Sequence, residues 1–125
     1  MKKRPEILVI GGFDPSGGAG VLADVKVSER LKCYAVSVQT ANTIQSADVF
    51  ESVNWTDKEV FFQQLDLILN FHQPKTVKIG LIRFDWLDEL LNKLKENQPS
   101  TFVVWDPILS ASAGFDFHQK LNFTF

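Results

Sequence analysis

The sequence predicts an α/β protein with three layers, in which a mostly parallel β-sheet lies between helices. Two observations lead to this fold class. Short apolar runs rich in β-branched residues recur along the chain, and stretches with apolar residues at helical spacing separate them. Parallel strands need a crossover connection that is usually a helix, so this alternation is typical of right-handed βαβ units with a Rossmann-like core.

In the first half of the chain, a strand is expected at residues 7–10, because a continuous apolar run is typical of a strand buried on both faces. The glycine-rich segment 14–20 has turn chemistry, and apolar residues at helical spacing over 21–31 predict a helix after it. A second strand is expected at 34–40, and weak alternation at 49–53 suits a short edge strand or flap.

In the second half, Thr56 with Glu59 three residues later forms a capping-box pattern that predicts the start of a second helix. A third strand is expected at 76–79, a third helix at 84–95 and a fourth strand at 101–105. In open α/β sheets the ligand crevice lies beyond the carboxyl ends of the strands, where all the unusual loops of this sequence fall.

The last predicted strand, 101–105, contains no charge and lacks the lysines or prolines that protect an edge strand. It therefore resembles an internal strand that needs a neighbour. Four aromatic residues, Phe115, Phe117, Phe123 and Phe125, follow in a short tail. We expect residues 1–125 to be the N-terminal part of a single larger domain, truncated after the fourth strand; a naturally short homologue is the alternative.

Composition excludes several classes of protein. Hydrophobic residues make up 45% and charged residues 22%, which is a globular balance, and the formal charge of −2 lacks the basic footprint of a nucleic-acid binder. No apolar stretch approaches the ~20 residues of a membrane span. With one cysteine, Cys33, and two histidines, no internal disulfide or zinc site is expected, and a cytoplasmic location is the default.

The glycine-rich segment 11–20 is the most informative motif. A Walker A loop would need a lysine after its second spaced glycine, and none is present. Residues 18–23 match a dinucleotide-binding pattern, but they come well after the strand, and segment 39–41 lacks the acidic residue that would bind a ribose. The glycines either allow a tight turn only or leave backbone N–H groups facing a ligand; their density favours the ligand.

These residues also carry a family resemblance. The sequence DPSGGAG at 14–20, followed by AD at 23–24, resembles the N-terminal signature of the hydroxymethylpyrimidine and phosphomethylpyrimidine kinases of thiamine biosynthesis, which have a ribokinase-like fold. Further matches follow in the same order: SVQTA at 37–41 leading to Gln45, KIGL at 78–81 and DPIL at 106–109.

The resemblance implies transfer of the ATP γ-phosphoryl group to the hydroxymethyl group of an aminopyrimidine and then to its monophosphate, with ATP and Mg²⁺ as cofactors, in a homodimer. It also implies a substrate pocket in this half of the domain. Gly12 would approach the ring through its backbone, Asp24 would accept a hydrogen bond, Gln45 would pair with the aminopyrimidine, and Leu81 and Ile108 would form apolar walls. An amide suits this role because it has a donor and an acceptor side by side.

Asp106, after the last strand, is assigned to cofactor binding, through Mg²⁺ or the phosphates; simple Asp-Pro turn chemistry is the alternative. For Gln45 the alternative is a solvated loop residue, and for Asp24 a carboxylate favoured by the helix macrodipole. Three positions depart from the family pattern: Phe13, Ser46 and Ser112.

The later family motifs, an acidic segment for metal-ATP and a Gly-Thr-Gly-Cys anion hole, have no counterpart, so no catalytic residue and no metal ligand is assigned. The leading hypothesis is therefore the substrate-binding part of a pyrimidine kinase that is inactive alone. The alternatives are a non-catalytic pyrimidine-binding or regulatory module and a flavodoxin-like nucleotide-binding domain.

Overall fold

The computed structural model describes residues 3–110 and 116–117. Its five strands form one sheet in the order β3-β2-β1-β4-β5. All neighbouring strands are parallel except β3, which runs antiparallel to β2. The strands are β1 (Glu6–Phe13), β2 (Tyr34–Gln45), β3 (Phe50–Trp55), β4 (Thr76–Ile79) and β5 (Phe102–Trp105), and the helices are α1 (Gly20–Arg30), α2 (Lys58–Phe71) and α3 (Phe84–Asn97).

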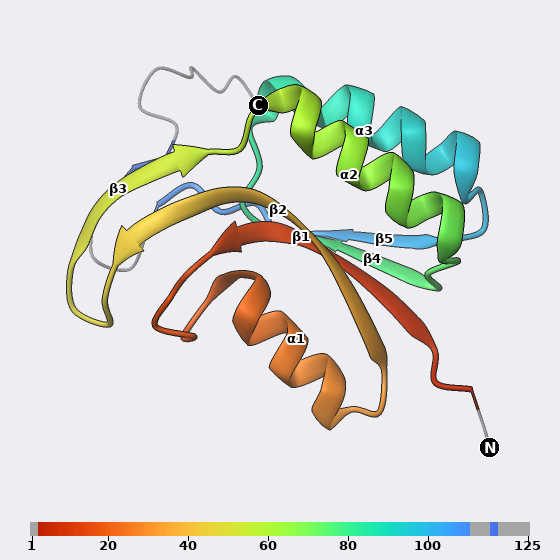
Figure 1. Cartoon of the computed structure of the whole chain (residues 1–125), viewed down its shortest axis with the longest axis horizontal. Helices are drawn as coiled ribbons and strands as arrows, with labels where there is room; N and C mark the ends of the chain where they lie inside the picture. Colours follow the sequence, from red (N-terminus) through yellow and green to blue (C-terminus); the bar gives the residue numbers. More distant parts are fainter. Residues whose placement is uncertain (1–2, 111–115, 118–125) are drawn as a thin grey trace.

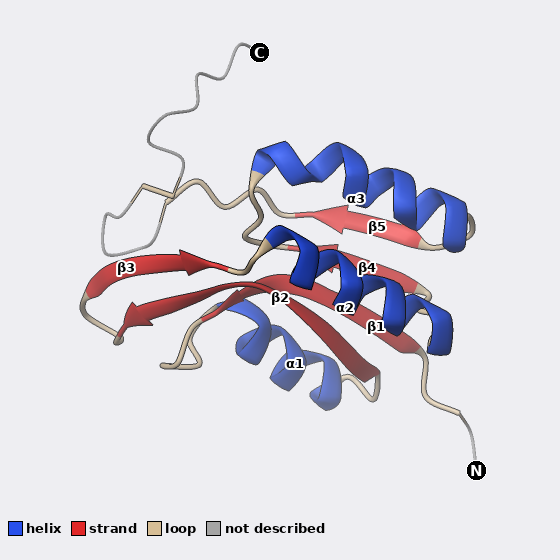
Figure 2. Cartoon of the chain, turned by 45° about the horizontal axis from the view of Figure 1, so that its top comes forward, coloured by secondary structure: helices blue, strands red, loops and turns tan. Residues whose placement is uncertain are grey.

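Helices cover both faces of the sheet. In Figure 1, α1 lies on one face, against β1 and β2, and α2 and α3 lie side by side on the other. Figure 2 shows the same three layers from a second direction. The predicted three-layer α/β architecture is therefore confirmed. No helix within the described ranges is long and apolar enough to cross a membrane.

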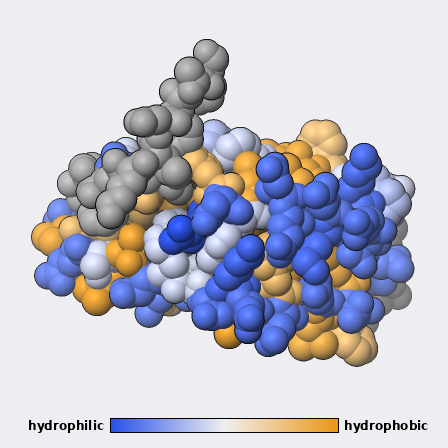
Figure 3. Space-filling model, turned by 90° about the horizontal axis from the view of Figure 1, so that it is seen from above, coloured by the Kyte–Doolittle hydropathy of each residue, from blue (hydrophilic) through white to orange (hydrophobic). Residues whose placement is uncertain are grey.

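The main core lies between the sheet and the α2–α3 layer. Leu8 and Ile10 of β1 belong to this core, together with Phe61 of α2 and Leu90 of α3, and all four are fully buried. Val9 is equally buried but lies outside this cluster, because alternate residues of a strand point to opposite faces. The strand is therefore buried on both faces, as predicted. Hydrophilic side chains cover much of the outer side of the α2–α3 layer (Figure 3).

Two strands are longer than the sequence predicts. Strand β1 continues to Phe13, and its pairing with β2 continues past an irregularity between Gly11 and Gly12. Strand β2 continues to Gln45 and pairs with β3 over its last residues. The sequence predicts that the strand ends before Gly11 and Gly12, but both glycines remain in the ladder, opposite Gln39 and Ala41, and Thr40 of β2 is the extra residue at the irregularity. Because β3 is a full strand of the sheet, the segment that the sequence predicts as the fourth strand, residues 101–105, corresponds to β5.

The start of α2 differs by one residue from the capping box predicted at Thr56. The N-cap is Asp57, whose carboxylate accepts hydrogen bonds from the backbone N–H groups of Glu59 and Val60 at 2.9 and 3.4 Å. The hydroxyl of Thr56 instead donates to the carbonyl of Gln39 at 3.0 Å. The Thr56 side chain, which the local sequence predicts as the N-cap of α2, is therefore used in a tertiary contact with β2.

Strand β5 lies at the edge of the sheet that the described residues form, where it pairs with β4 only. Its apolar side chains are partly exposed: 69% of Phe102, 36% of Val103, 42% of Val104 and 41% of Trp105 remain accessible. An uncharged apolar edge is a template for pairing with another strand.

We therefore predict that the chain self-associates through β5 and that Val104→Lys weakens this association, because a lysine places a charge on the pairing edge. Sedimentation velocity over a range of concentrations measures the effect. Val60→Lys, which changes an exposed valine on α2, is the matched control and should leave association unchanged. A wild-type chain that stays monomeric at every concentration would contradict the prediction.

Candidate functional site

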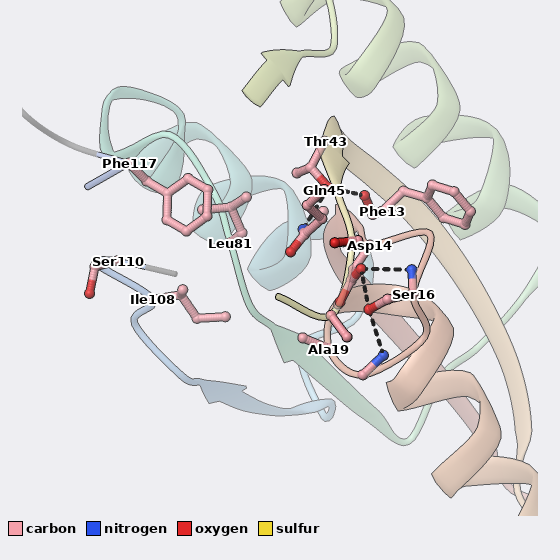
Figure 4. A pocket seen from close by; sticks show the side chains of 15 residues that line it. Phe13, Asp14, Ser16, Ala19, Thr43, Gln45, Leu81, Ile108, Ser110 and Phe117 are labelled. Carbon is pink, nitrogen blue, oxygen red and sulfur yellow. Dashed lines mark hydrogen bonds between the residues drawn. The ribbon is translucent and has the colours of Figure 1, made fainter. Parts of the chain in front are cut away.

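A pocket of about 410 Å³ opens beyond the carboxyl ends of β1 and β2. Figure 4 shows side chains from these strand ends, from the loop before α1 and from the segments after β4 and β5 converging on it. The lining residues are Gly12, Phe13, Asp14, Ser16, Gly18, Ala19, Gly20, Thr43, Gln45, Ser46, Ala47, Leu81, Ile108, Ser110 and Phe117. A cavity thus lies beyond the carboxyl ends of the strands, where the sequence predicts the ligand crevice.

The loop from residue 14 to residue 19 is held by its own hydrogen bonds. The carboxylate of Asp14, only 6% exposed, accepts hydrogen bonds from the backbone N–H and the hydroxyl of Ser16 at 2.8 and 2.7 Å. The N–H of Gly17 donates to the Asp14 carbonyl at 3.1 Å. This is the local chemistry of an Asx-turn, and it organises the loop on one side of the pocket.

Glycine is required at residue 20, where the end of this loop packs against the backbone of β1. Gly20 has a left-handed backbone with φ +66°, and a side chain there would collide with the Gly12 carbonyl oxygen. Gly12 faces Leu81 closely, since a Cβ on Gly12 would lie 2.9 Å from Leu81 Cδ2. The start of α1 is thereby packed against the backbone of β1, and Leu81 closes the pocket beside it.

Gln45 lines the pocket from the end of β2. Its Nε2 donates to Thr43 Oγ1 at 2.7 Å, and Thr43 Oγ1 in turn donates to the Phe13 carbonyl at 2.8 Å (Figure 4). Gln45 is therefore part of a hydrogen-bonded network at a strand end. Gly12, Leu81 and Ile108 line the same cavity, so the structure brings four of the predicted substrate residues together.

Asp24 does not reach the pocket. It lies on α1, where both carboxylate oxygens accept hydrogen bonds from Lys78 Nζ of β4 at 2.6 and 2.7 Å. The two side chains are 21% and 28% exposed, so this is a largely buried ion pair that links helix to sheet. The substrate contact that the resemblance implies for Asp24 stays a prediction, and in this structure its side chain links α1 to β4.

Asp106 also lies outside the pocket lining. It is exposed, and its backbone N–H donates to the Ile79 carbonyl at 2.8 Å, which continues the β4–β5 ladder. No group of three or more His, Cys, Asp or Glu side chains in residues 3–110 and 116–117 is arranged to hold a metal ion. The assignment of Asp106 to cofactor binding stays a prediction.

One ion pair near the site has a resolved electrostatic effect. A hydrogen bond from Arg83, at 3.0 Å, is the main cause that holds the pKa of the Asp85 carboxyl below its usual range. This pair lies at the start of α3, and neither residue lines the pocket. None of the described residues that line the pocket is a lysine or an arginine.

Sequence reasoning missed Thr43 and Asp14 as lining residues. Asp14 opens the motif that carries the family resemblance, but no substrate contact is predicted for it. Thr43 is two residues before Gln45, so the two side chains share a face once the strand is extended to residue 45. Of the departures from the family pattern, Phe13 and Ser46 both line the pocket, and Ser112 lies outside the described residues.

A parallel sheet between helices, with a glycine-rich loop and a small pocket at its carboxyl edge, defines an α/β domain of the kind that binds small molecules. Comparison with known proteins identifies the family. The model of the phosphomethylpyrimidine kinase family matches residues 14–124, and the chain belongs to this family.

Relatives and solved structures agree with this assignment. A hydroxymethylpyrimidine/phosphomethylpyrimidine kinase of Saccharomyces cerevisiae, THI20, is 40% identical over 116 residues, which cover 90% of this chain and 21% of the yeast protein. A crystal structure of phosphomethylpyrimidine kinase from Clostridium difficile matches with a TM-score of 0.80 at 30% identity, covering 91% of this chain and 49% of that one. The fold is thus the ribokinase-like fold, of which this chain forms a part.

A third match is a pyridoxal kinase from Staphylococcus aureus in complex with AMP-PCP, with a TM-score of 0.76 and 26% identity, covering 89% of this chain and 40% of that one. A related kinase therefore binds an ATP analogue. The chain spans between about a fifth and a half of the length of the curated relatives.

We predict that Gly20→Ala lowers the free energy of unfolding, by about 1–2 kcal/mol for the left-handed backbone alone. Displacement of the Gly12 backbone adds to this loss. Gly80→Ala is the control, because its new Cβ would meet its nearest neighbours at 3.6 and 3.7 Å, in ordinary contact. Urea unfolding measures both variants, and equal stability for the two would contradict the argument.

Proposed function

We propose that this chain is the pyrimidine-binding part of a kinase that phosphorylates 4-amino-5-hydroxymethyl-2-methylpyrimidine and then its monophosphate, with ATP as the donor. One observation carries the proposal: the Gln45 amide lies in a small pocket beside the apolar side chains of Leu81 and Ile108. Membership of the phosphomethylpyrimidine kinase family supports the same substrate class.

The pocket has the size and chemistry that a flat heterocycle needs. Its volume of about 410 Å³ lies in the lower part of the range of roughly 300–1,000 Å³ that is typical of small-molecule sites. Apolar side chains bury the faces of a ring, and a few placed polar groups fix its orientation. Gln45 provides such a group, with Asp14 and Ser16 on the loop opposite.

The nucleotide requires residues beyond this pocket. Phosphoryl transfer depends on positioning and on cations or N–H groups that neutralise charge on the phosphates. Asp106 lies outside the pocket, and none of the described residues that line the pocket is a lysine or an arginine, so this pocket lacks the cationic side chains that neutralise a polyphosphate. Under the proposal, the part of the relatives that this chain does not cover binds ATP and supplies the catalytic residues.

A second candidate function is a module that binds a pyrimidine without chemistry. It rests on the same pocket, in which the Gln45 amide and the apolar side chains of Leu81 and Ile108 provide for binding, while the described residues supply no identified catalytic group. The two functions predict the same ligand and differ only in whether turnover follows when the remaining part of a kinase is supplied.

We predict that the chain binds 4-amino-5-hydroxymethyl-2-methylpyrimidine and that Gln45→Ala weakens binding about 5- to 150-fold, the equivalent of losing roughly 1–3 kcal/mol of buried hydrogen bonding. Isothermal titration calorimetry measures the affinity. Gln64→Ala, an exposed glutamine on α2, is the matched control and should bind like wild type. Unchanged affinity in Gln45→Ala would remove this residue from the site.

We also predict that the chain alone shows no ATP-dependent phosphorylation above background, because the described residues that line its pocket include no cationic side chain to neutralise the phosphates. A chimaera in which it replaces the matching segment of the Escherichia coli kinase, which is 34% identical, should phosphorylate the pyrimidine. A coupled ADP-release assay measures both. Turnover by the chain alone would contradict the first expectation, and a folded chimaera that binds without turnover would favour the non-catalytic module.

A further inference from the structure

The hydrogen bonds around Thr43 fix the orientation of the Gln45 amide. Thr43 is only 5% exposed, and its hydroxyl donates its single proton to the Phe13 carbonyl at 2.8 Å. A carbonyl oxygen can only accept, so the direction of this bond is fixed. The oxygen of Thr43 is then left as an acceptor, and the group of Gln45 that faces it must be the NH₂ end, at 2.7 Å.

An amide held in this way presents a defined pattern to the pocket. One N–H of Gln45 is used by Thr43, which leaves the second N–H and the carbonyl oxygen for a ligand. Rotation of the amide by half a turn would place the Gln45 oxygen against the Thr43 oxygen, whose proton is already donated. The network thus disfavours the orientation in which the NH₂ group and the oxygen of the Gln45 amide have exchanged places.

This order of donor and acceptor distinguishes two kinds of pyrimidine. The edge of a 4-aminopyrimidine has a ring-nitrogen acceptor beside an amino donor. The edge of the 4-oxo analogue has the reverse, a ring N–H donor beside a carbonyl acceptor. An amide that rotates without cost can pair with either edge. An amide held in one orientation pairs with only one edge, because against the other edge donor would face donor and acceptor would face acceptor.

We propose that Thr43 is a specificity-determining residue that makes this pocket select a 4-amino over a 4-oxo pyrimidine by holding the Gln45 amide in one orientation. The proposal rests on the proposed function, because it takes Gln45 as the residue that meets the pyrimidine edge. Thr43 acts through Gln45 and is a positioning residue. Its own place is set by β2, which pairs with β1 on one side and β3 on the other.

The test is the ratio of two affinities. Isothermal titration calorimetry of the full chain with 4-amino-5-hydroxymethyl-2-methylpyrimidine and with its 4-oxo analogue should show that wild type prefers the amino compound about ten-fold or more. Thr43→Val, of similar shape, should reduce this ratio by about five-fold, the worth of one net hydrogen bond. Thr43→Ser retains the hydroxyl and should keep the wild-type ratio. General loosening of the pocket would weaken both ligands together and leave the ratio unchanged.

The outcomes separate the two proposals. If wild type binds neither compound, the proposed function fails and the role of Thr43 fails with it. If wild type prefers the amino compound and Thr43→Val has the same ratio, only the role of Thr43 is overturned.

A measurement on wild type alone covers the case in which Thr43→Val does not fold. In ¹H–¹⁵N spectra, one of the two side-chain amide protons of Gln45 should exchange with solvent more slowly than those of the exposed Gln64. Exchange of both Gln45 protons as fast as those of Gln64 would overturn the proposal.

Discussion

The pairing of β1 with β2 beyond Gly11 is the constraint on which the pocket depends. The irregularity at Gly11 and Gly12 lets the ladder continue to Phe13 and Asn42, two residues after the shift. Phe13 is thereby placed where its carbonyl accepts from Thr43, and the glycine-rich loop begins directly beside the end of β2. The sequence predicts that β1 ends at Ile10, and the loop would then begin three residues earlier. The Phe13 carbonyl would no longer be held by strand pairing at the place where Thr43 donates to it. The bulge therefore couples the loop, the amide of Gln45 and the two strand ends in one structure.

Among the described residues that line the pocket, only Asp14 carries a charge, and the ion pairs elsewhere connect parts of the fold. The carboxylate of Asp14 is occupied by Ser16 and organises the loop. Asp24, which the family resemblance assigns to the substrate, pairs with Lys78 across α1 and β4 in this structure. Removing one partner of a buried ion pair leaves an unpaired buried charge, and this loss of stability is larger than the net stabilisation that the pair provides. Substitution of either Asp24 or Lys78 alone is therefore unfavourable. A lining of small, apolar and amide groups suits a neutral heterocycle better than a polyphosphate, which needs cations or many N–H donors.

The two ends of the described sheet differ in how they are protected. At one end, β3 turns back antiparallel on β2 and covers the strand that carries Thr43 and Gln45. At the other end, β5 exposes apolar side chains, and only Trp105 has a ring contact, with Phe84 at 5.8 Å. The side of the sheet that carries the candidate pocket is thus the better enclosed side. This difference between the two ends of the sheet agrees with the proposal on nucleotide binding. Under that proposal, the nucleotide is bound by the part of the relatives that this chain does not cover.

Much of this protein follows from local sequence alone. Short apolar runs and helical spacing predict the three layers, because strand and helix periods are properties of neighbouring residues. The DPSGGAG motif predicts the family, and Gly12, Gln45, Leu81 and Ile108 do line one pocket. Tertiary structure decided the partners of individual polar groups: Lys78 for Asp24, Gln39 for Thr56, and Phe13 and Gln45 for Thr43. A polar side chain bonds to the best-placed group within about 3 Å, and that group is set by chain packing rather than by sequence distance.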